Sequence, residues 1–335
     1  MLVVRLRSIG DTVLATPALV ALRRFLPDAR IDVLLEDWVA PVLEDFDAVD
    51  NVLTVTRKSK KSRFEVAREL RRNRYDVAFN LHGGTTATFF VRASGAPHRV
   101  GFSHYSYKFL YNHVLSSGAD YWQREFTHSA EQQLALLGFV GVPVADKPKS
   151  RLVVSEKRAE EMDLFLHVEG LDEKRIALIH PAAAFDTKQW ASEKFAEVID
   201  YLAARNIFSV LVATPPEEKV IDEIRKKTST AFRSFTALTL PEIAALAARA
   251  GVFVGNDSGI AHIAAAVGTP SVVVFGSSNI NHWRPWTDAP NAIVYEKLPC
   301  QPCAGYFCKE FDAPRCILSV RTESVIEAIE KVLKK

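Results

Sequence analysis

Residues 252–268 read VFVGNDSGIAHIAAAVG: a short apolar run, a Gly-Asn-Asp-Ser-Gly segment and an alanine-rich stretch follow one another. The apolar run predicts a buried strand, and residues 258–267 are typical of a helix that Asp257 or Ser258 caps. Free backbone amides and the positive end of the helix dipole would face a ligand there, and Gly259 lets it approach the backbone. The stretch therefore predicts an α/β fold with an anion-binding site at the carboxyl end of a parallel strand. A capped junction without a ligand is the alternative that these residues leave open.

Predicted strands and helices alternate along both halves of the chain. The strands are expected at residues 2–6, 31–35, 51–55, 76–81, 175–180, 208–213, 252–254 and 271–275. The helices are expected at residues 12–25, 39–44, 64–72, 86–93, 192–204 with Ser192 as its N-cap, 216–227, 240–250 and 258–267, and near 325–333. This alternation is typical of parallel sheets that helices cover on both faces.

Residues 141–155 separate the two halves, because this segment is polar, contains proline and is weakly patterned. A chain of 335 residues is long enough for two such domains. We therefore expect two Rossmann-like, doubly wound domains, residues 1–150 and 151–335, that face each other across a cleft. The last helix either closes the second domain or packs back on the first, and both arrangements are open.

The composition excludes several classes of protein. It is 48% hydrophobic and 24% charged, which is typical of a globular protein in water, and the net charge of +2 argues against nucleic-acid binding. No apolar run reaches the length of a membrane span. Arg5, Arg7 and Asp11 interrupt the apolar start too early for a secretory signal. We therefore expect a cytoplasmic protein.

Two further segments carry polar groups at the ends of predicted strands. Residues 180–190 form a small-residue loop with the Thr187 hydroxyl and the Lys188 ammonium, a point charge suited to a diphosphate. A solvated loop lysine is the alternative. Residues 8–12 follow the first strand, and Asp11 there can act as a general base, as a helix N-cap, or as both.

Common nucleotide and nucleophile motifs are missing from the sequence. No G-x-G-x-x-G follows the first strand, and neither G-x-x-x-x-G-K-[ST] nor G-x-S-x-G is present. Dinucleotide dehydrogenases, P-loop kinases and hydrolases with a nucleophile elbow are therefore disfavoured.

Three motifs resemble those of glycosyltransferase family 9, the lipopolysaccharide heptosyltransferases. They are Arg-Ser-Ile-Gly-Asp at residues 7–11, Lys-Gln-Trp at 188–190, and Asn-Asp-Ser-Gly-Ile-Ala-His at 256–262. Their order and spacing match over nearly the whole chain. The resemblance implies the GT-B fold and an inverting transfer of heptose from ADP-heptose to a glycolipid acceptor, the inner core of lipopolysaccharide. It also implies that catalysis needs no metal or other cofactor.

The resemblance also implies roles for individual residues. Asp11 corresponds to the general base, and Lys188 and Thr187 to contacts of the diphosphate. The donor-binding segment comprises Asp257, Ser258, Gly259 and His262. An acidic residue of the second domain holds the ribose in this family; we expect Glu218, with Glu217 as the alternative, because Thr-Pro-Pro at 214–216 departs from a more Gly-rich form.

The acceptor site is expected where residues 80–86, Asn-Leu-His-Gly-Gly-Thr-Thr, end a strand of the first domain. We expect His82, Gly83 and Thr85 to contact the acceptor. The family often has an acidic residue where Asn80 stands and a basic one shortly after the glycine pair, so this chain departs from the pattern there.

A basic run at residues 57–74 contains nine Lys or Arg residues and two Glu. Phe64, Ala67 and Leu70 lie at helical spacing opposite many of these charges. One interpretation is peripheral contact with anionic lipid headgroups on the cytoplasmic face of the inner membrane. A solvated helix face is the other, and both are open.

All four cysteines lie in one segment, at Cys300, Cys303, Cys308 and Cys316. Four thiolates at this spacing can bind a structural Zn²⁺ tetrahedrally, although the last spacings are looser than in standard zinc motifs. Free thiols and a partly oxidised loop are the alternatives.

Two other functions remain as alternatives to heptosyl transfer. A GT-B transferase could use another nucleotide sugar or another glycan acceptor. A protein without catalysis could bind a sugar nucleotide in an assembly complex, but the presence of both Asp11 and Lys188 favours an enzyme.

Overall fold

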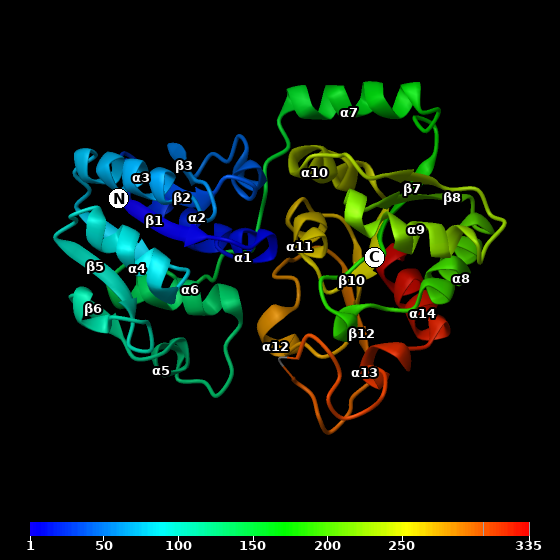
Figure 1. Ribbon diagram of the computed structural model, residues 1–335. Helices are drawn as coiled ribbons and strands as arrows, with labels where there is room; N and C mark the ends of the chain where they lie inside the picture. Colours follow the sequence, from blue (N-terminus) through cyan, green and yellow to red (C-terminus); the bar gives the residue numbers. More distant parts are fainter. Residues whose placement is uncertain (304, 335) are drawn as a thin grey trace. The chain divides into compact units, whose positions relative to one another are not determined.

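The computed structural model describes residues 1–303 and 305–334. The chain divides into two compact units, Met1–Val153 and Val154–Lys335 (Figure 1). Each unit contains one six-stranded sheet in which all hydrogen-bonded neighbours are parallel. The predicted fold class, two doubly wound α/β domains, is confirmed. Within the described residues no helix is long and apolar enough to cross a membrane.

The sheet of the first unit has the strand order β3-β2-β1-β4-β5-β6. The strands are β1 (Leu2–Leu6), β2 (Asp32–Glu36), β3 (Asn51–Val55), β4 (Val77–Asn80), β5 (His98–Phe102) and β6 (His113–Leu115). Leu2 pairs with Asp32 of β2 on one side and with Ala78 of β4 on the other. The chain therefore builds the sheet outward from β1 in both directions, and the strand order reverses between β1 and β4.

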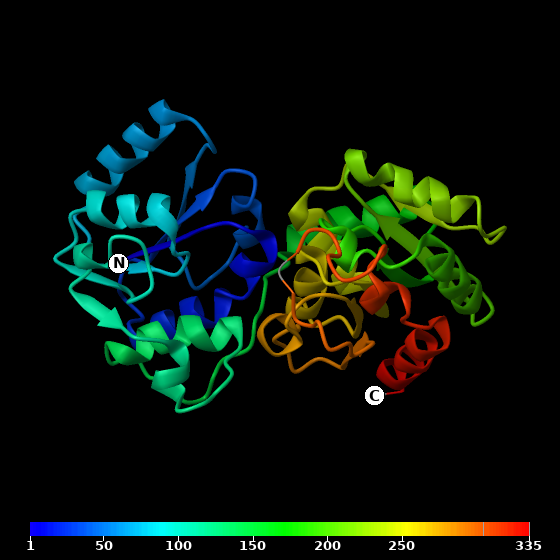
Figure 2. The same cartoon turned by 60° about the horizontal axis from the view of Figure 1, so that its bottom comes forward.

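Helices cover both faces of this sheet. They are α1 (Ile9–Val13), α2 (Thr16–Phe25), α3 (Lys60–Arg72), α4 (Gly84–Ala93), α5 (Gly118–Trp122) and α6 (Ser129–Phe139), with short 3₁₀ turns at Ala40–Leu43 (η1) and Lys108–Leu110 (η2). In Figures 1 and 2, α3 and α4 lie on one face and α2 and α6 on the other. The apolar sides of α3 and α4 pack against the sheet through Val66, Leu70, Phe90 and Val91.

One helix predicted at residues 12–25 is in fact two, α1 and α2, so that prediction was wrong. Pro17 lies in the first turn of α2 and has no backbone N–H to donate to the carbonyl of Val13. The hydroxyl of Thr16 donates to that carbonyl instead, at 2.7 Å. The backbone ladder is thus interrupted where the sequence places proline, and a new helix begins.

The sheet of the second unit has the order β12-β11-β10-β7-β8-β9. Read from the other edge and numbered from β7 as the first strand, this is the same order, 3-2-1-4-5-6, as in the first unit. The strands are β7 (Arg175–His180), β8 (Ile207–Val212), β9 (Arg233–Phe235), β10 (Val252–Asn256), β11 (Ser271–Phe275) and β12 (Asn291–Tyr295). The order reverses here between β7 and β10. The two units thus repeat one topology.

The helices of the second unit are α7 (Glu156–Val168), α8 (Ser192–Ala203), α9 (Glu218–Arg225), α10 (Leu240–Arg249), α11 (Gly259–Ala266), α12 (Ile280–Trp283), α13 (Arg315–Leu318) and α14 (Thr322–Leu333). Short 3₁₀ turns lie at Asp186–Lys188 (η3) and Pro215–Glu217 (η4). Ser192 is the first residue of α8 and Ala191 occupies the N-cap position, so the predicted cap was one residue off.

The last helix packs within the second unit. Val325, Ile329 and Val332 of α14 share one apolar core with Val254 of β10 and Val272 of β11. Helix α14 is therefore part of the core of the second unit.

Candidate active site

In a parallel sheet, the loops on either side of an order reversal leave in opposite directions and open a crevice at the carboxyl edge. In the first unit these loops follow β1 and β4, and in the second unit they follow β7 and β10. Most of the side chains singled out in the sequence lie on these four loops. Each unit therefore carries a candidate site at the position that its topology favours.

An ion pair forms the centre of the site in the second unit. The Nζ of Lys188, in η3, lies 2.7 Å from Oδ2 of Asp257, which directly follows β10. The hydroxyl of Ser278, in the loop after β11, donates to the same carboxylate oxygen. The Asp257 side chain is almost fully buried, whereas that of Lys188 is 22% exposed. Asp257 thus holds an accessible ammonium beside the start of α11.

The N-terminus of α11 adds a second source of positive potential. Ser258 is the N-cap and accepts from the amide of Ala261 at 3.4 Å, so the cap is Ser258 and not Asp257. Gly259 begins the helix and His262 lies one turn further, buried. The first amides of a helix have no partner within it. Together with Lys188, they make this edge suited to an anion.

His180 ends β7 in the same site, and the sequence analysis did not single it out. Its Nδ1 lies 3.2 Å from Oγ of Ser258, and this contact connects the end of β7 to the loop after β10. Burial lowers the pKa of His180 to about 4, against the opposing effect of the Glu217 carboxylate. The imidazole is therefore neutral near pH 7.

Of the two candidate ribose residues, Glu217 is half-buried and Glu218 is exposed at the start of α9. The Glu217 carboxylate accepts from the backbone N–H and the hydroxyl of Thr214, both at 2.8 Å. Its charge also acts on His180. Glu217 thus lies electrostatically closer to the centre of the site, and the assignment of the ribose contact stays a prediction for both.

Thr187 is buried and connects loops. Its hydroxyl donates to the carbonyl of Gly305 at 2.9 Å and accepts from the hydroxyl of Ser277 at 2.9 Å. The Thr187 hydroxyl proton, which would otherwise be donated to a phosphate, is therefore already donated to the Gly305 carbonyl in this conformation. Its role as a phosphate donor stays a prediction.

Asn256 organises the loop after β7, a role that the sequence analysis did not assign to it. Its side chain is fully buried, accepts from the amide of Trp190 at 3.2 Å and donates to the carbonyl of Pro181 at 2.8 Å. A polar residue at the end of an otherwise apolar strand was the available signal, because a buried amide must find hydrogen-bond partners.

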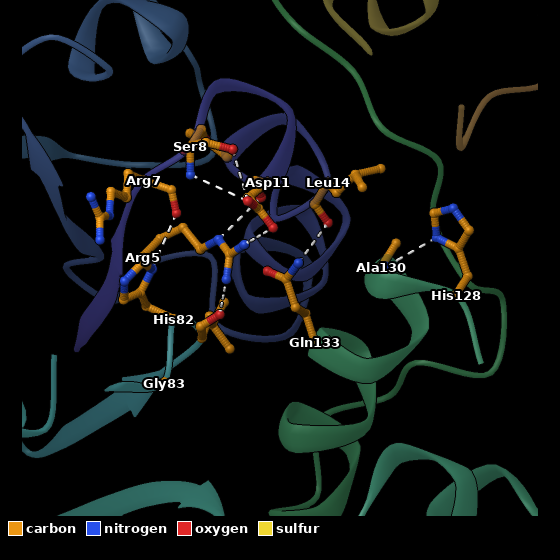
Figure 3. Close-up of polar contacts among 12 residues, drawn as sticks. Arg5, Arg7, Ser8, Asp11, Leu14, His82, Gly83, His128, Ala130 and Gln133 are labelled. Atoms are coloured by element: carbon orange, nitrogen blue, oxygen red, sulfur yellow. Dashed lines mark hydrogen bonds and ion pairs between the residues drawn. The ribbon is translucent and has the colours of Figure 1, made fainter. Parts of the chain in front are cut away.

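Asp11 forms the centre of the site in the first unit (Figure 3). Its carboxylate pairs with Arg5 of β1 and accepts from the Ser8 hydroxyl at 2.8 Å. Ser8 is the N-cap of α1, and Asp11 occupies the third helical position, from which it reaches back to the Ser8 amide at 3.3 Å. The predicted capping role thus takes the form of a capping box. The Asp11 side chain is 23% exposed, more than that of Arg5.

The loop after β4 lies against this aspartate loop. The Nδ1 of His82 lies 3.1 Å from the carbonyl of Arg7 (Figure 3). Burial and the nearby Arg5 charge lower the pKa of His82, while Asp11 acts in the opposite direction. The structure thus brings His82 and Asp11 into one site.

The turn after β4 depends on a buried amide. The side-chain oxygen of Asn80 accepts from the amides of His82 at 3.0 Å and Gly83 at 2.8 Å. Gly83 has φ +76°, and a Cβ there would meet the Tyr105 ring at 2.9 Å, so glycine is required. Thr85 is exposed in the first turn of α4.

The four cysteines line one cavity of about 290 Å³, together with Thr187. All four are free thiols, and burial together with the charges of the other three raises the pKa of Cys316. Among residues 1–303 and 305–334, no group of three or more His, Cys, Asp or Glu side chains is arranged to hold a metal ion. The structural zinc site stays a prediction.

The chain is similar to known glycosyltransferases over most of its length. The family model "Glycosyltransferase family 9 (heptosyltransferase)" matches residues 63–312. A lipopolysaccharide heptosyltransferase 3 of Escherichia coli is 33% identical, over 98% of this chain and 97% of the relative.

Two solved structures share the fold. A family 9 glycosyl transferase of Veillonella parvula DSM 2008 has a TM-score of 0.86 at 22% identity, covering 99% of this chain and 96% of that one. The ADP-heptose LPS heptosyltransferase II of E. coli has a TM-score of 0.82 at 21% identity, covering 99% and 98%.

His180 predicts a pH dependence of stability. As the pH is lowered from 7 to 5, His180 takes up a proton in the unfolded chain but not in the folded protein. The free energy of unfolding therefore decreases as the pH is lowered. Urea unfolding should show that the wild-type protein loses about 2 kcal/mol more over this range than His180→Asn. His104→Asn, at an exposed position of the first unit, is the control. An equal pH dependence in wild type and His180→Asn would contradict the buried, neutral state of His180.

Proposed function

The chain belongs to glycosyltransferase family 9 and is a glycosyltransferase, and we propose that it transfers heptose from ADP-heptose to the inner core of lipopolysaccharide. The main support for a nucleotide-sugar donor is the Lys188 ammonium, which lies beside the N-terminus of α11. The name of the 33% identical relative supports the sugar and the class of acceptor. The solved E. coli enzyme with the same fold is named for ADP-heptose.

The donor diphosphate lies at Lys188 and the first amides of α11 in this proposal. Lys188 is paired with Asp257 in the free protein, so an incoming diphosphate shares or replaces that carboxylate as its partner. As the bond between the sugar and ADP breaks, negative charge grows on the diphosphate. The ammonium and the helix dipole offset this charge from fixed positions. That fixed charge is the basis for proposing a transfer that needs no metal.

The other donor contacts follow from their places around this pair. Ser258, Gly259 and His262 belong to the start of α11, where they would face the diphosphate and the sugar. Asp257 holds Lys188 in position. Glu218, or Glu217 beside it, accepts from the ribose hydroxyls.

Asp11 is the proposed general base. It takes the proton of the acceptor hydroxyl, whose oxygen then attacks the anomeric carbon from the face opposite ADP. One C–O bond forms, the bond to the diphosphate breaks, and ADP leaves with the electron pair. The configuration at the anomeric carbon is thereby inverted. Arg5 and Ser8 hold the carboxylate in one orientation through the contacts described above.

The acceptor glycan contacts the loop after β4 in this proposal. His82 lies beside the Asp11 loop, and its lowered pKa keeps the ring neutral near pH 7. A neutral imidazole whose Nδ1 faces the Arg7 carbonyl has its other nitrogen left to meet a sugar hydroxyl. Gly83 keeps the turn open, and Thr85 offers an exposed hydroxyl.

The role of Asp11 predicts a specific loss. Asp11→Asn keeps the size of the side chain and removes the base, so kcat should fall by roughly a hundredfold or more. The Kd for ADP should not change, because the nucleotide binds elsewhere. Turnover is measured in excess EDTA, and Asp28→Asn, at an exposed position of the same unit, is the matched control. Full turnover by Asp11→Asn would exclude Asp11 as the base.

Lys188→Ala should weaken ADP binding by roughly tenfold to a hundredfold, because a charged hydrogen bond to phosphate contributes about 1.5–3 kcal/mol. The affinity for adenosine, which has no phosphate, should stay the same. Calorimetry measures both, with Lys226→Ala as a control at an exposed lysine of the same unit. Equal ADP affinity in wild type and Lys188→Ala would remove Lys188 from the diphosphate site.

Nucleotide selectivity separates this function from its alternatives. ADP, UDP and GDP share the diphosphate and differ in the base, so calorimetry with the three reports base recognition alone. We expect ADP to bind at least about tenfold more tightly, a difference of about 1.4 kcal/mol. A preference for UDP or GDP would indicate a transferase with another donor. Selective ADP binding without any turnover would indicate a protein that binds the sugar nucleotide without catalysis.

A further inference from the structure

A groove runs between α3 and α4 on the outer side of the first unit, away from the sheet. Figures 1 and 2 both show the two helices side by side. The groove has a volume of about 740 Å³, and its lining comprises Phe64, Ala67, Arg68, Arg71 and Arg72 of α3 and Phe89, Arg92 and Ala93 of α4. The two helices bury their other sides against the sheet. The groove is therefore a surface feature that the packing of this unit does not use.

Four arginine side chains give the groove a strong positive charge. They are Arg68, Arg71, Arg72 and Arg92, and none of the described residues that line the groove is acidic. Within residues 1–303 and 305–334, no ion pair or side-chain hydrogen bond engages these four guanidinium groups. Glu65, one of the two acidic residues of α3, pairs with Lys61 instead, at 3.9 Å. The positive charge is therefore not compensated by the protein.

The Arg71 side chain reaches the backbone just after the end of α4. Its guanidinium occupies the space where a side chain at position 95 would lie, and Gly95 has φ +73°. Arg71 also borders a second polar pocket, whose lining includes Arg74 and the acidic Asp76. Arg71 is thus shared by the groove and this pocket, and Arg68, Arg72 and Arg92 line the groove alone.

Two phenylalanine side chains are exposed in this charged groove. Phe64 is 74% exposed and Phe89 is 47% exposed. Leaving such rings in water forgoes the free energy that their burial would provide. Surfaces that lie in the interface of an anionic membrane combine exposed aromatic or aliphatic side chains, which enter the bilayer, with basic side chains, which the anionic headgroups attract. The occupant that matches both features carries phosphate groups next to hydrocarbon.

We propose that this groove docks the first unit onto a bilayer of anionic phospholipids. The headgroup phosphates lie among the four arginines. Each guanidinium group can donate two parallel hydrogen bonds to two oxygens of one phosphate. The rings of Phe64 and Phe89 enter the level of the upper acyl chains. A solvated basic helix, the other interpretation of residues 57–74, does not account for Phe89 and Arg92, which come from a different helix.

The test is co-sedimentation of the full chain with vesicles, without donor or acceptor, so that its outcome is independent of the proposed function. We expect binding to vesicles of phosphatidylglycerol mixed with phosphatidylcholine, weaker binding as salt is added, and little binding to phosphatidylcholine alone. Changing Arg68, Arg71, Arg72 and Arg92 together to Gln should lower the partition coefficient on the order of a hundredfold or more. Phe64→Ser with Phe89→Ser should lower it by about tenfold.

A matched control removes the same charge elsewhere. Lys219, Lys226, Lys227 and Lys331 are exposed lysines of the second unit, and changing them to Gln should leave vesicle binding nearly as in the wild type. The thermal midpoint of each variant checks that it is folded. Vesicle binding by the arginine variant at the wild-type level would overturn the proposal, as would equal binding to both kinds of vesicle. Release of the protein from vesicles by inorganic phosphate, at the concentration of the lipid phosphate, would assign the groove to a soluble phosphate ligand and overturn it too.

Discussion

The reversal of strand order beside the first strand is the constraint on which both sites depend. A parallel strand delivers its next loop to the carboxyl edge, and only at a reversal do two neighbouring loops leave in opposite directions. In the first unit this places Asp11 and His82 together, and in the second it places Lys188 and Asp257 together. The topology is thus the reason that residues far apart in the sequence meet at one point.

Buried amides and ion pairs turn these two edges into defined sites. The strand after each reversal ends in a buried asparagine. Asn80 accepts from amides of the turn that follows it, and Asn256 bonds backbone groups of the neighbouring loop after β7. Each site then holds a charged pair whose more exposed member faces solvent: Asp11 beside Arg5, and Lys188 beside Asp257. A side chain fixed in this way loses little entropy on binding, which favours positioned acid–base and electrostatic chemistry.

Much of this arrangement could be predicted from the sequence, because buried parallel strands are apolar runs that end in polar residues. The predicted strands at residues 2–6, 51–55, 175–180 and 271–275 match the structure residue for residue. Four strands were missed. The edge strands β6, β9 and β12 are partly exposed and their apolar pattern is weak, and in β5 only Val100 and Phe102 are apolar. Partnerships such as that of His180 with Ser258, or of Phe89 with the basic helix, arise from tertiary packing and leave no local signal.

The proposed reaction is a single displacement at the anomeric carbon of the donor, with Asp11 as base and ADP as leaving group. Nuclear magnetic resonance of the product formed from ADP-heptose and a lipopolysaccharide inner-core acceptor reports the configuration at that carbon directly. Direct displacement predicts that the transferred heptose has the configuration opposite to that in the donor. Heptose transferred with retained configuration would contradict direct displacement, and no transfer to any inner-core acceptor would contradict the proposed reaction.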